Sequence, residues 1–156
     1  MAEAARPALV IPAFGRIYES LSECVYPLMR FTMGAILVPH GMQKLFGVFG
    51  APAMDAYVKT FAGLGAWAAS PFWVNYIGCL EFFGGICIAL GLLTRFWALQ
   101  AAAFMAIAAF LVQGKVAYFW TSKGMELPLT WMIFFLIILI RGGGKCSIDR
   151  MIGKEF

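Results

Sequence analysis

Five ionisable side chains lie inside or at the rims of otherwise apolar stretches, where a lipid-buried protein could use their chemistry. They are Arg30, His40, Lys44, Glu81 and Glu126. A charge at the centre of a membrane-spanning helix costs at least ~2.5 kcal/mol, so each such residue is a functional-site candidate that needs a partner. An imidazole also exchanges a proton near neutral pH. These residues therefore mark a candidate functional site, with His40 as the candidate proton-exchanging residue.

The composition indicates that these charges sit in an integral membrane protein. The chain has 156 residues, of which 62% are hydrophobic and only 13% are charged, too few for the polar surface of a soluble domain. The first residues contain no apolar run followed by a small-residue cleavage site, so no cleaved signal peptide is expected. The net charge of +4 is dispersed without a basic aromatic face, which argues against a nucleic-acid partner.

Four apolar segments approach the ~20 residues that a helix needs to cross the bilayer. They are residues 24–43, 72–93, 96–113 and 127–141. We therefore predict an all-α polytopic membrane protein, a single domain over residues 1–156 with four transmembrane helices in a compact bundle. A short interfacial helix is expected between the first two spans, at about residues 52–62.

The distribution of Lys and Arg predicts that both termini are cytoplasmic. This orientation places seven cations inside and four outside, in accordance with the positive-inside rule. The inside set is Arg6, Arg16, Arg95, Arg141, Lys145, Arg150 and Lys154, and the outside set is Lys44, Lys59, Lys115 and Lys123. Residues 1–23 are then an N-terminal cytoplasmic or interfacial segment, and residues 142–156 are a cytoplasmic tail.

Two of the charges are predicted to meet near the middle of the membrane. At ~1.5 Å per helical residue, Arg30 and Glu81 lie at similar depths on sequential antiparallel helices. Each would lower the desolvation cost of the other, so we predict a buried ion pair between Arg30 and Glu81. A purely structural role, in which the pair fixes the helix register, is as compatible with the sequence as a functional one.

A second polar cluster is predicted near the outer face. Its members, the candidate ligand-binding residues, are His40, Gln43, Lys44, Gln113 and Glu126. His40 and Lys44 are four residues apart and share one helix face. The same side chains also fit structural roles: Lys44 could snorkel to the interface, Glu126 could complement a helix N-terminus, and His40 could be a hydrogen-bonded packing residue.

Several cofactors are not expected in this chain. With one histidine, bis-histidine haem ligation is impossible, and no cluster has the spacing of a zinc or iron–sulfur site. No Gly-rich phosphate loop indicates a nucleotide. No C-x-x-C pair occurs among the four cysteines, Cys24, Cys79, Cys87 and Cys146. Structural thiols are therefore favoured over a thiol relay. A redox cofactor would have to be lipid-soluble, such as a quinone, or belong to a partner.

An ordered set of short segments resembles the DoxX family of small four-helix membrane proteins. The segments are Arg30-Phe-Thr-Met-Gly34, His40-Gly-Met-Gln-Lys44, Glu81 with Gly84-Gly85, Leu90-Gly-Leu-Leu-Thr-Arg95, Gly124-Met-Glu126 and Gly142-Gly-Gly-Lys-Cys-Ser-Ile-Asp149. The resemblance implies a bacterial inner-membrane protein linked to quinone-dependent oxidoreductase assemblies. The chain departs from the family pattern at Leu127-Pro128, where an aromatic residue is common, and at Gln113, where the family often has a histidine in the third loop.

Three functions are compatible with these observations. The first is an accessory subunit of a membrane-bound quinone-linked oxidoreductase, which binds a quinone or lipid head group near the outer face. The second is a non-catalytic scaffold that holds a protein partner or forms a homo-oligomer in the membrane. The third is a carrier for a small lipid or metabolite. The sequence does not decide whether the chain is an enzyme.

Overall fold

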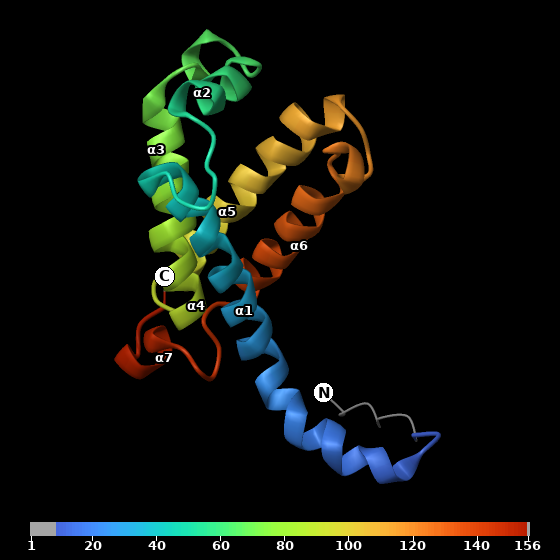
Figure 1. Cartoon of the computed structure of the whole chain (residues 1–156). Helices are drawn as coiled ribbons and strands as arrows, with labels where there is room; N and C mark the ends of the chain where they lie inside the picture. Colours follow the sequence, from blue (N-terminus) through green and yellow to red (C-terminus); the bar gives the residue numbers. More distant parts are fainter. Residues whose placement is uncertain (1–8, 156) are drawn as a thin grey trace.

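The computed structural model of the chain describes residues 9–155, which fold into helices joined by turns (Figure 1). No strand occurs within these residues, and the predicted all-α class is confirmed. In chain order the elements are η1 (Pro12–Phe14), α1 (Gly15–Phe46), α2 (Met54–Ala62), η2 (Ala66–Ala68), α3 (Pro71–Cys79), η3 (Leu80–Gly84), α4 (Gly85–Leu90), α5 (Thr94–Ala106), η4 (Ile107–Val112), η5 (Gln113–Lys115), η6 (Trp120–Ser122), α6 (Glu126–Arg141) and α7 (Ile148–Ile152). The elements η3 and η4 are π-helical turns.

Three continuous helical stretches are long and apolar enough to cross a membrane. They are Pro12–Phe46, Pro71–Leu90 and Thr94–Lys115, and their residues overlap those of the first three predicted spans. The fourth predicted span coincides with α6, but its 16 residues are fewer than the ~20 that a helix needs to cross the bilayer. The number of membrane crossings therefore stays a prediction. The helix expected at residues 52–62 corresponds to α2.

The first long helix begins earlier than its apolar stretch suggested. Residues 15–23, predicted to belong to an N-terminal segment outside the first span, form the first turns of α1. These turns extend away from the other helices (Figure 1). The segment contains no proline or internal glycine that would end a helix, so the helix continues upstream of the apolar stretch. Residues 1–8 of the predicted segment lie outside the described residues.

Glycines bring α1 into backbone contact with α3, η3 and α4. A Cβ on Gly34 would lie 2.4 Å from the nitrogen of Ala89 and 2.5 Å from the carbonyl oxygen of Gly85. Further along the helix, a Cβ on Gly41 would lie 2.3 Å from the nitrogen of Phe82. Small residues allow helices to approach this closely in a membrane, where packing rather than the hydrophobic effect drives association. These contacts fix the register of the antiparallel helices.

Small residues also support the packing of α5 against α6. Ala98, Ala101 and Ala102 are fully or almost fully buried on α5. They belong to the same core cluster as Phe135 and Ile138 of α6, both with no exposed surface. The alanine face accepts the bulky side chains, so the two helices form a closely packed hairpin (Figure 1).

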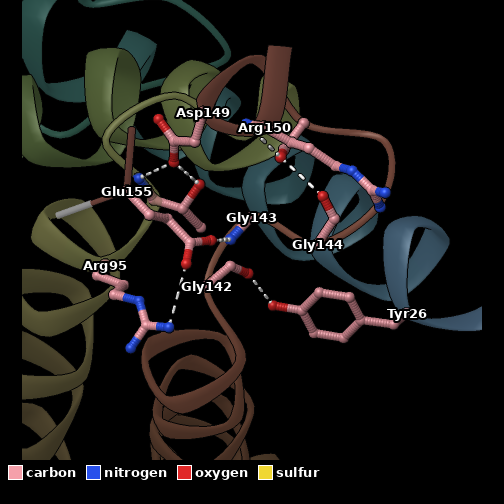
Figure 2. Close-up of polar contacts among 10 residues, drawn as sticks. Tyr26, Arg95, Gly142, Gly143, Gly144, Asp149, Arg150 and Glu155 are labelled. Carbon is pink, nitrogen blue, oxygen red and sulfur yellow. Dashed lines mark hydrogen bonds and ion pairs between the residues drawn. The ribbon is translucent and has the colours of Figure 1, made fainter. Parts of the chain in front are cut away.

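The chain after α6 folds back onto the turn between α4 and α5. The carboxylate of Asp149 accepts hydrogen bonds from the backbone nitrogens of Leu93 and Thr94, at 2.7 and 2.9 Å, and from the Thr94 hydroxyl at 2.6 Å. The Asp149 nitrogen donates to the carbonyl of Gly91 at 2.9 Å. Asp149 therefore caps the N-terminus of α5 from a distant part of the sequence. The predicted tail is, in its described residues, a packed part of the fold (Figure 2).

Substitution of Gly34 tests the close helix contact. Gly34→Ala places a methyl group against backbone atoms that cannot move independently, so it should lower the free energy of unfolding by about 1–3 kcal/mol. Titration of the purified protein with a denaturing detergent in mixed micelles measures this value. Gly63→Ala is the matched control, because Gly63 has a helical φ of −63° and its nearest contact would be at 3.4 Å. Equal stability of the two variants would contradict the packing.

Substitution of Asp149 tests the cap on α5. Asp149→Asn removes the charge that accepts three hydrogen bonds and should cost roughly 3 kcal/mol of unfolding free energy in the same titration. Asp55→Asn, on an exposed carboxylate in the first turn of α2, is the control and should cost less than about 1 kcal/mol. If Asp149→Asn lowered the unfolding free energy no more than Asp55→Asn does, the cap would not stabilise the turn between α4 and α5.

Candidate functional site

A cavity of about 190 Å³ lies between α1, η3, α5 with η4 and η5, and the first turns of α6. We call it the polar cavity, because His40, Glu81 and Gln113 line it beside the apolar residues Leu37, Phe104, Met105, Ala108, Leu127, Pro128 and Trp131. His40 is exposed, Gln113 is half-buried and Glu81 is buried. Three predicted site residues from three different helical stretches therefore meet around one space.

An ion pair forms part of this site. The Lys44 ammonium lies 2.6 Å from Oε2 of Glu81, with side-chain exposures of only 12% and 5%. Lys44 follows His40 by one helical turn, and its ammonium also lies 5.6 Å from the centroid of the Tyr57 ring on α2. Burial, together with the Glu81 carboxylate, raises the pKa of the Tyr57 phenol above its ordinary value. Helix α2 thus contacts the ion pair through Tyr57.

The predicted ion pair between Arg30 and Glu81 is wrong. In the register set by the glycines, Arg30 lies beside Gly91, and its Nη1 would be 2.7 Å from a Cβ at that position. Glu81 instead lies across from the last turns of α1, where Lys44 reaches it. The prediction assumed that both helices begin at the same depth in the membrane. The backbone contacts at Gly34 and Gly41 instead determine how far α1 is displaced along the stretch of α3, η3 and α4.

Arg30 binds backbone carbonyl groups. Its Nη1 donates to the carbonyl oxygens of Ile88 and Ala89, at 2.5 and 2.8 Å, and its Nη2 donates to that of Cys146 at 2.5 Å. The residue is 2% exposed. A cation at the C-terminal end of α4 is stabilised by the carbonyl oxygens and the dipole at that end of the helix. Arg30 therefore joins α1, α4 and the segment after α6, and it does not line the polar cavity.

Two other predicted site residues lie outside the polar cavity. The Gln43 amide donates to the carbonyl of Phe49 at 3.3 Å. The Glu126 carboxylate accepts from the backbone nitrogen of Trp120 at 3.1 Å, in the turn that precedes α6. Both side chains stabilise local loop structure. Of the predicted outer cluster, the structure brings together His40 and Gln113, with Lys44 reaching the same cavity through Glu81.

The sequence analysis did not identify two contributions to the site. Trp131 packs edge-on against His40, with ring centroids 6.3 Å apart and an interplanar angle of 82°. The π-helical turns η3 and η4 supply Glu81 and Ala108 to the cavity wall. Such turns insert an extra residue into a helix and occur frequently at functional sites. The apolar sequences around both turns gave no signal for them.

A second, apolar cavity adjoins the polar one. It measures about 390 Å³ between α2, η2, α3 and α5, and its walls include Trp67, Trp73, Tyr76, Ile77 and Leu80. Three residues, Phe104, Ala108 and Gln113, line both cavities. The two spaces are therefore neighbours that share part of their lining, and together they offer a polar end and an apolar end. Within residues 9–155 no group of three His, Cys, Asp or Glu side chains is placed to hold a metal ion.

A double-mutant cycle tests the coupling of Lys44 and Glu81. Lys44→Met leaves a buried carboxylate without its counter-ion and should lower the free energy of unfolding by about 3–5 kcal/mol. Lys44→Met combined with Glu81→Gln should recover most of that loss, because the buried charge is then absent as well. Lys59→Met, on the exposed face of α2, is the control and should change little. Additive losses for the pair would contradict the interaction.

Comparison with known proteins assigns the chain to a family. The family model of DoxX matches residues 26–114. The inner membrane protein YqjF of Escherichia coli K12 is 32% identical over 124 residues, which cover 80% of this chain and 95% of the relative. An uncharacterized protein of Haemophilus influenzae is 36% identical over 81 residues, covering 50% and 60% of the two chains. No solved structure gives a significant match. With its membrane-spanning helices and these matches, the chain belongs to the DoxX family of integral membrane proteins.

Proposed function

We propose that the chain binds the head group of a membrane quinone in the polar cavity and acts as an accessory subunit of a quinone-linked oxidoreductase. The observation that carries this proposal is that the polar and apolar cavities are adjacent and share three lining residues. A quinone has a polar ring with two carbonyl oxygens and a long apolar tail. The larger cavity, with its aromatic and aliphatic walls, matches the tail, and the smaller one matches the ring.

The side chains in the polar cavity fit the chemistry of a quinone ring. The Gln113 amide can donate a hydrogen bond to a ring carbonyl oxygen, and the His40 imidazole can donate one or exchange a proton. Reduction of a quinone to a quinol takes two electrons and two protons. The electrons would come from a redox centre of the partner oxidoreductase, and His40 would be the proton-exchanging residue. Trp131 restricts the orientation of the imidazole by packing against it.

The proposed setting is a bacterial inner membrane with four crossings and both termini in the cytoplasm. The excess of Lys and Arg at one end of the helices supports this orientation, which places the polar cavity toward the outer face. Helix α6, at 16 residues, is about 24 Å long and would cross a locally thinned bilayer. The E. coli relative is named as an inner membrane protein, which supports the same location.

A scaffold function is the second candidate, and the shape of α1 favours it. Its N-terminal turns extend beyond the other helices (Figure 1). They expose apolar side chains such as Ile17, Leu21 and Val25. A protein partner or a second copy of the chain could pack on this surface. Under this alternative the polar cavity has no ligand, and the interaction of Lys44 with Glu81 serves stability alone.

Extraction of bound quinone tests the first proposal. The protein purified in native lipid should retain quinone, and His40→Ala should lower its affinity about tenfold or more through loss of one directed hydrogen bond. Gln43→Ala is the matched control, because Gln43 is on the same helix but bonds to Phe49 outside the cavity. Liquid chromatography of the extract measures the bound quinone. Absence of quinone from the unmodified protein, together with normal quinone reduction in a His40→Ala strain, would overturn the proposal.

A further inference from the structure

A groove of about 620 Å³ lies far from the polar cavity, between α1 and the chain that follows α6. We call it the basic groove. Ser22, Tyr26 and Pro27 of α1 form one side. The other side consists of the end of α6, the glycine turn and α7 with its flanking residues, which contribute Arg141, Lys145, Arg150 and Lys154. It shares no lining residue with either cavity described above.

The carboxylates in this groove are already bound to protein groups. Asp149 caps α5 through three hydrogen bonds. Glu155 accepts from the nitrogen of Gly143 at 2.6 Å and pairs with Arg95 at 3.2 Å (Figure 2). Glu23 pairs with Lys145. The lining of the groove thus contains three carboxylates against four cations, and the groove keeps a net positive charge.

Three cations in the groove have no carboxylate partner in the part of the chain from residue 9 to residue 155. They are Arg141, Arg150 and Lys154. The Arg141 guanidinium lies 4.4 Å from the centroid of the Tyr26 ring, which fixes its position over the groove. Arg150 and Lys154 are exposed. Two guanidinium groups and one ammonium around a concave surface form a favourable site for a phosphate group, because guanidinium binds phosphate through two parallel hydrogen bonds.

Apolar residues flank the basic groove on both sides. Val25 and Leu28 of α1 are 62% and 64% exposed, and Met151 and Ile152 of α7 are 86% and 60% exposed. Helix α7 is far too short to cross a bilayer, so its two large apolar side chains next to Arg150 are suited to the boundary between head groups and acyl chains. A free phosphate ion would gain nothing from these surfaces, whereas the acyl chains of a phospholipid would cover them.

We propose that the basic groove binds the phosphate of an anionic phospholipid. Arg141, Arg150 and Lys154 contact the phosphate, and the acyl chains run along the exposed apolar residues of α1 and α7. Basic pockets at the ends of membrane helices recognise anionic lipid head groups in this way. The lipid would join α1 to α7 and so stabilise the same segment in which Arg30 binds Cys146. This inference does not rest on quinone binding.

Native mass spectrometry of the full chain in mild detergent tests the site with phosphatidylglycerol. Phosphatidylethanolamine provides the zwitterionic comparison, and inorganic phosphate tests for binding of a free ion. Phosphatidylglycerol should bind well above phosphatidylethanolamine and should raise the thermal unfolding midpoint. Arg150→Gln/Lys154→Gln should weaken its binding about tenfold or more. Neither side chain contacts another residue through a described ion pair, so circular dichroism should show an unchanged helix content.

Two further variants complete the experiment. Lys115→Gln/Lys123→Gln removes the same charge from the loop between α5 and α6 and should leave binding unchanged. Met151→Ser/Ile152→Ser should weaken binding of the lipid and leave any response to inorganic phosphate as it was. The proposal would be overturned if the two charge variants weakened binding of phosphatidylglycerol equally, or if the two lipids bound equally. It would also be overturned if inorganic phosphate alone raised the thermal unfolding midpoint as much as phosphatidylglycerol does.

Discussion

The register between α1 and the antiparallel stretch of α3, η3 and α4 determines where two buried charges, Arg30 and Glu81, find their partners. It depends on the absence of side chains at Gly34 and Gly41, which lets backbones touch. A displacement by one turn, about 5.4 Å, would separate Lys44 from Glu81 and Arg30 from the carbonyls at the end of α4. The polar cavity exists because this register brings the π-helical turn with Glu81 to the level of His40.

The protein compensates two of its buried charges, Glu81 and Arg30, in different ways. Glu81 is neutralised by one ammonium, a point contact that leaves one side of the carboxylate facing the cavity. Arg30 uses three carbonyl oxygens, so its charge is spread over the end of a helix and a loop. The first arrangement leaves a charged group accessible to a ligand. The arrangement around Arg30 buries the charge and connects α1 to α4 and to the segment after α6.

The sequence predicted the helical class and the positions of the long helices, and it singled out His40 and Gln113, two residues that line the polar cavity. Those inferences rest on apolar length and on the cost of a buried charge, both of which are local properties. The partner of Arg30 could not be predicted, because a helix C-terminus offers a cation unpaired carbonyls that no residue type identifies. The cap by Asp149 was also missed, since it acts across 55 residues of sequence. Gln43 and Glu126 were misplaced by the assumption that polar residues at one depth share one cavity.

The packing of residues 146–149 constrains the order in which the protein assembles. These residues follow α1 to α6 in the chain, so the contacts that they make can form only after those helices have been synthesised. Until then the Arg30 guanidinium has only the carbonyl groups of α4 as hydrogen-bond acceptors, and the turn before α5 has no cap from Asp149. A chain truncated before residue 146 would therefore lack the hydrogen bonds that join α1 and the start of α5 to the C-terminal segment.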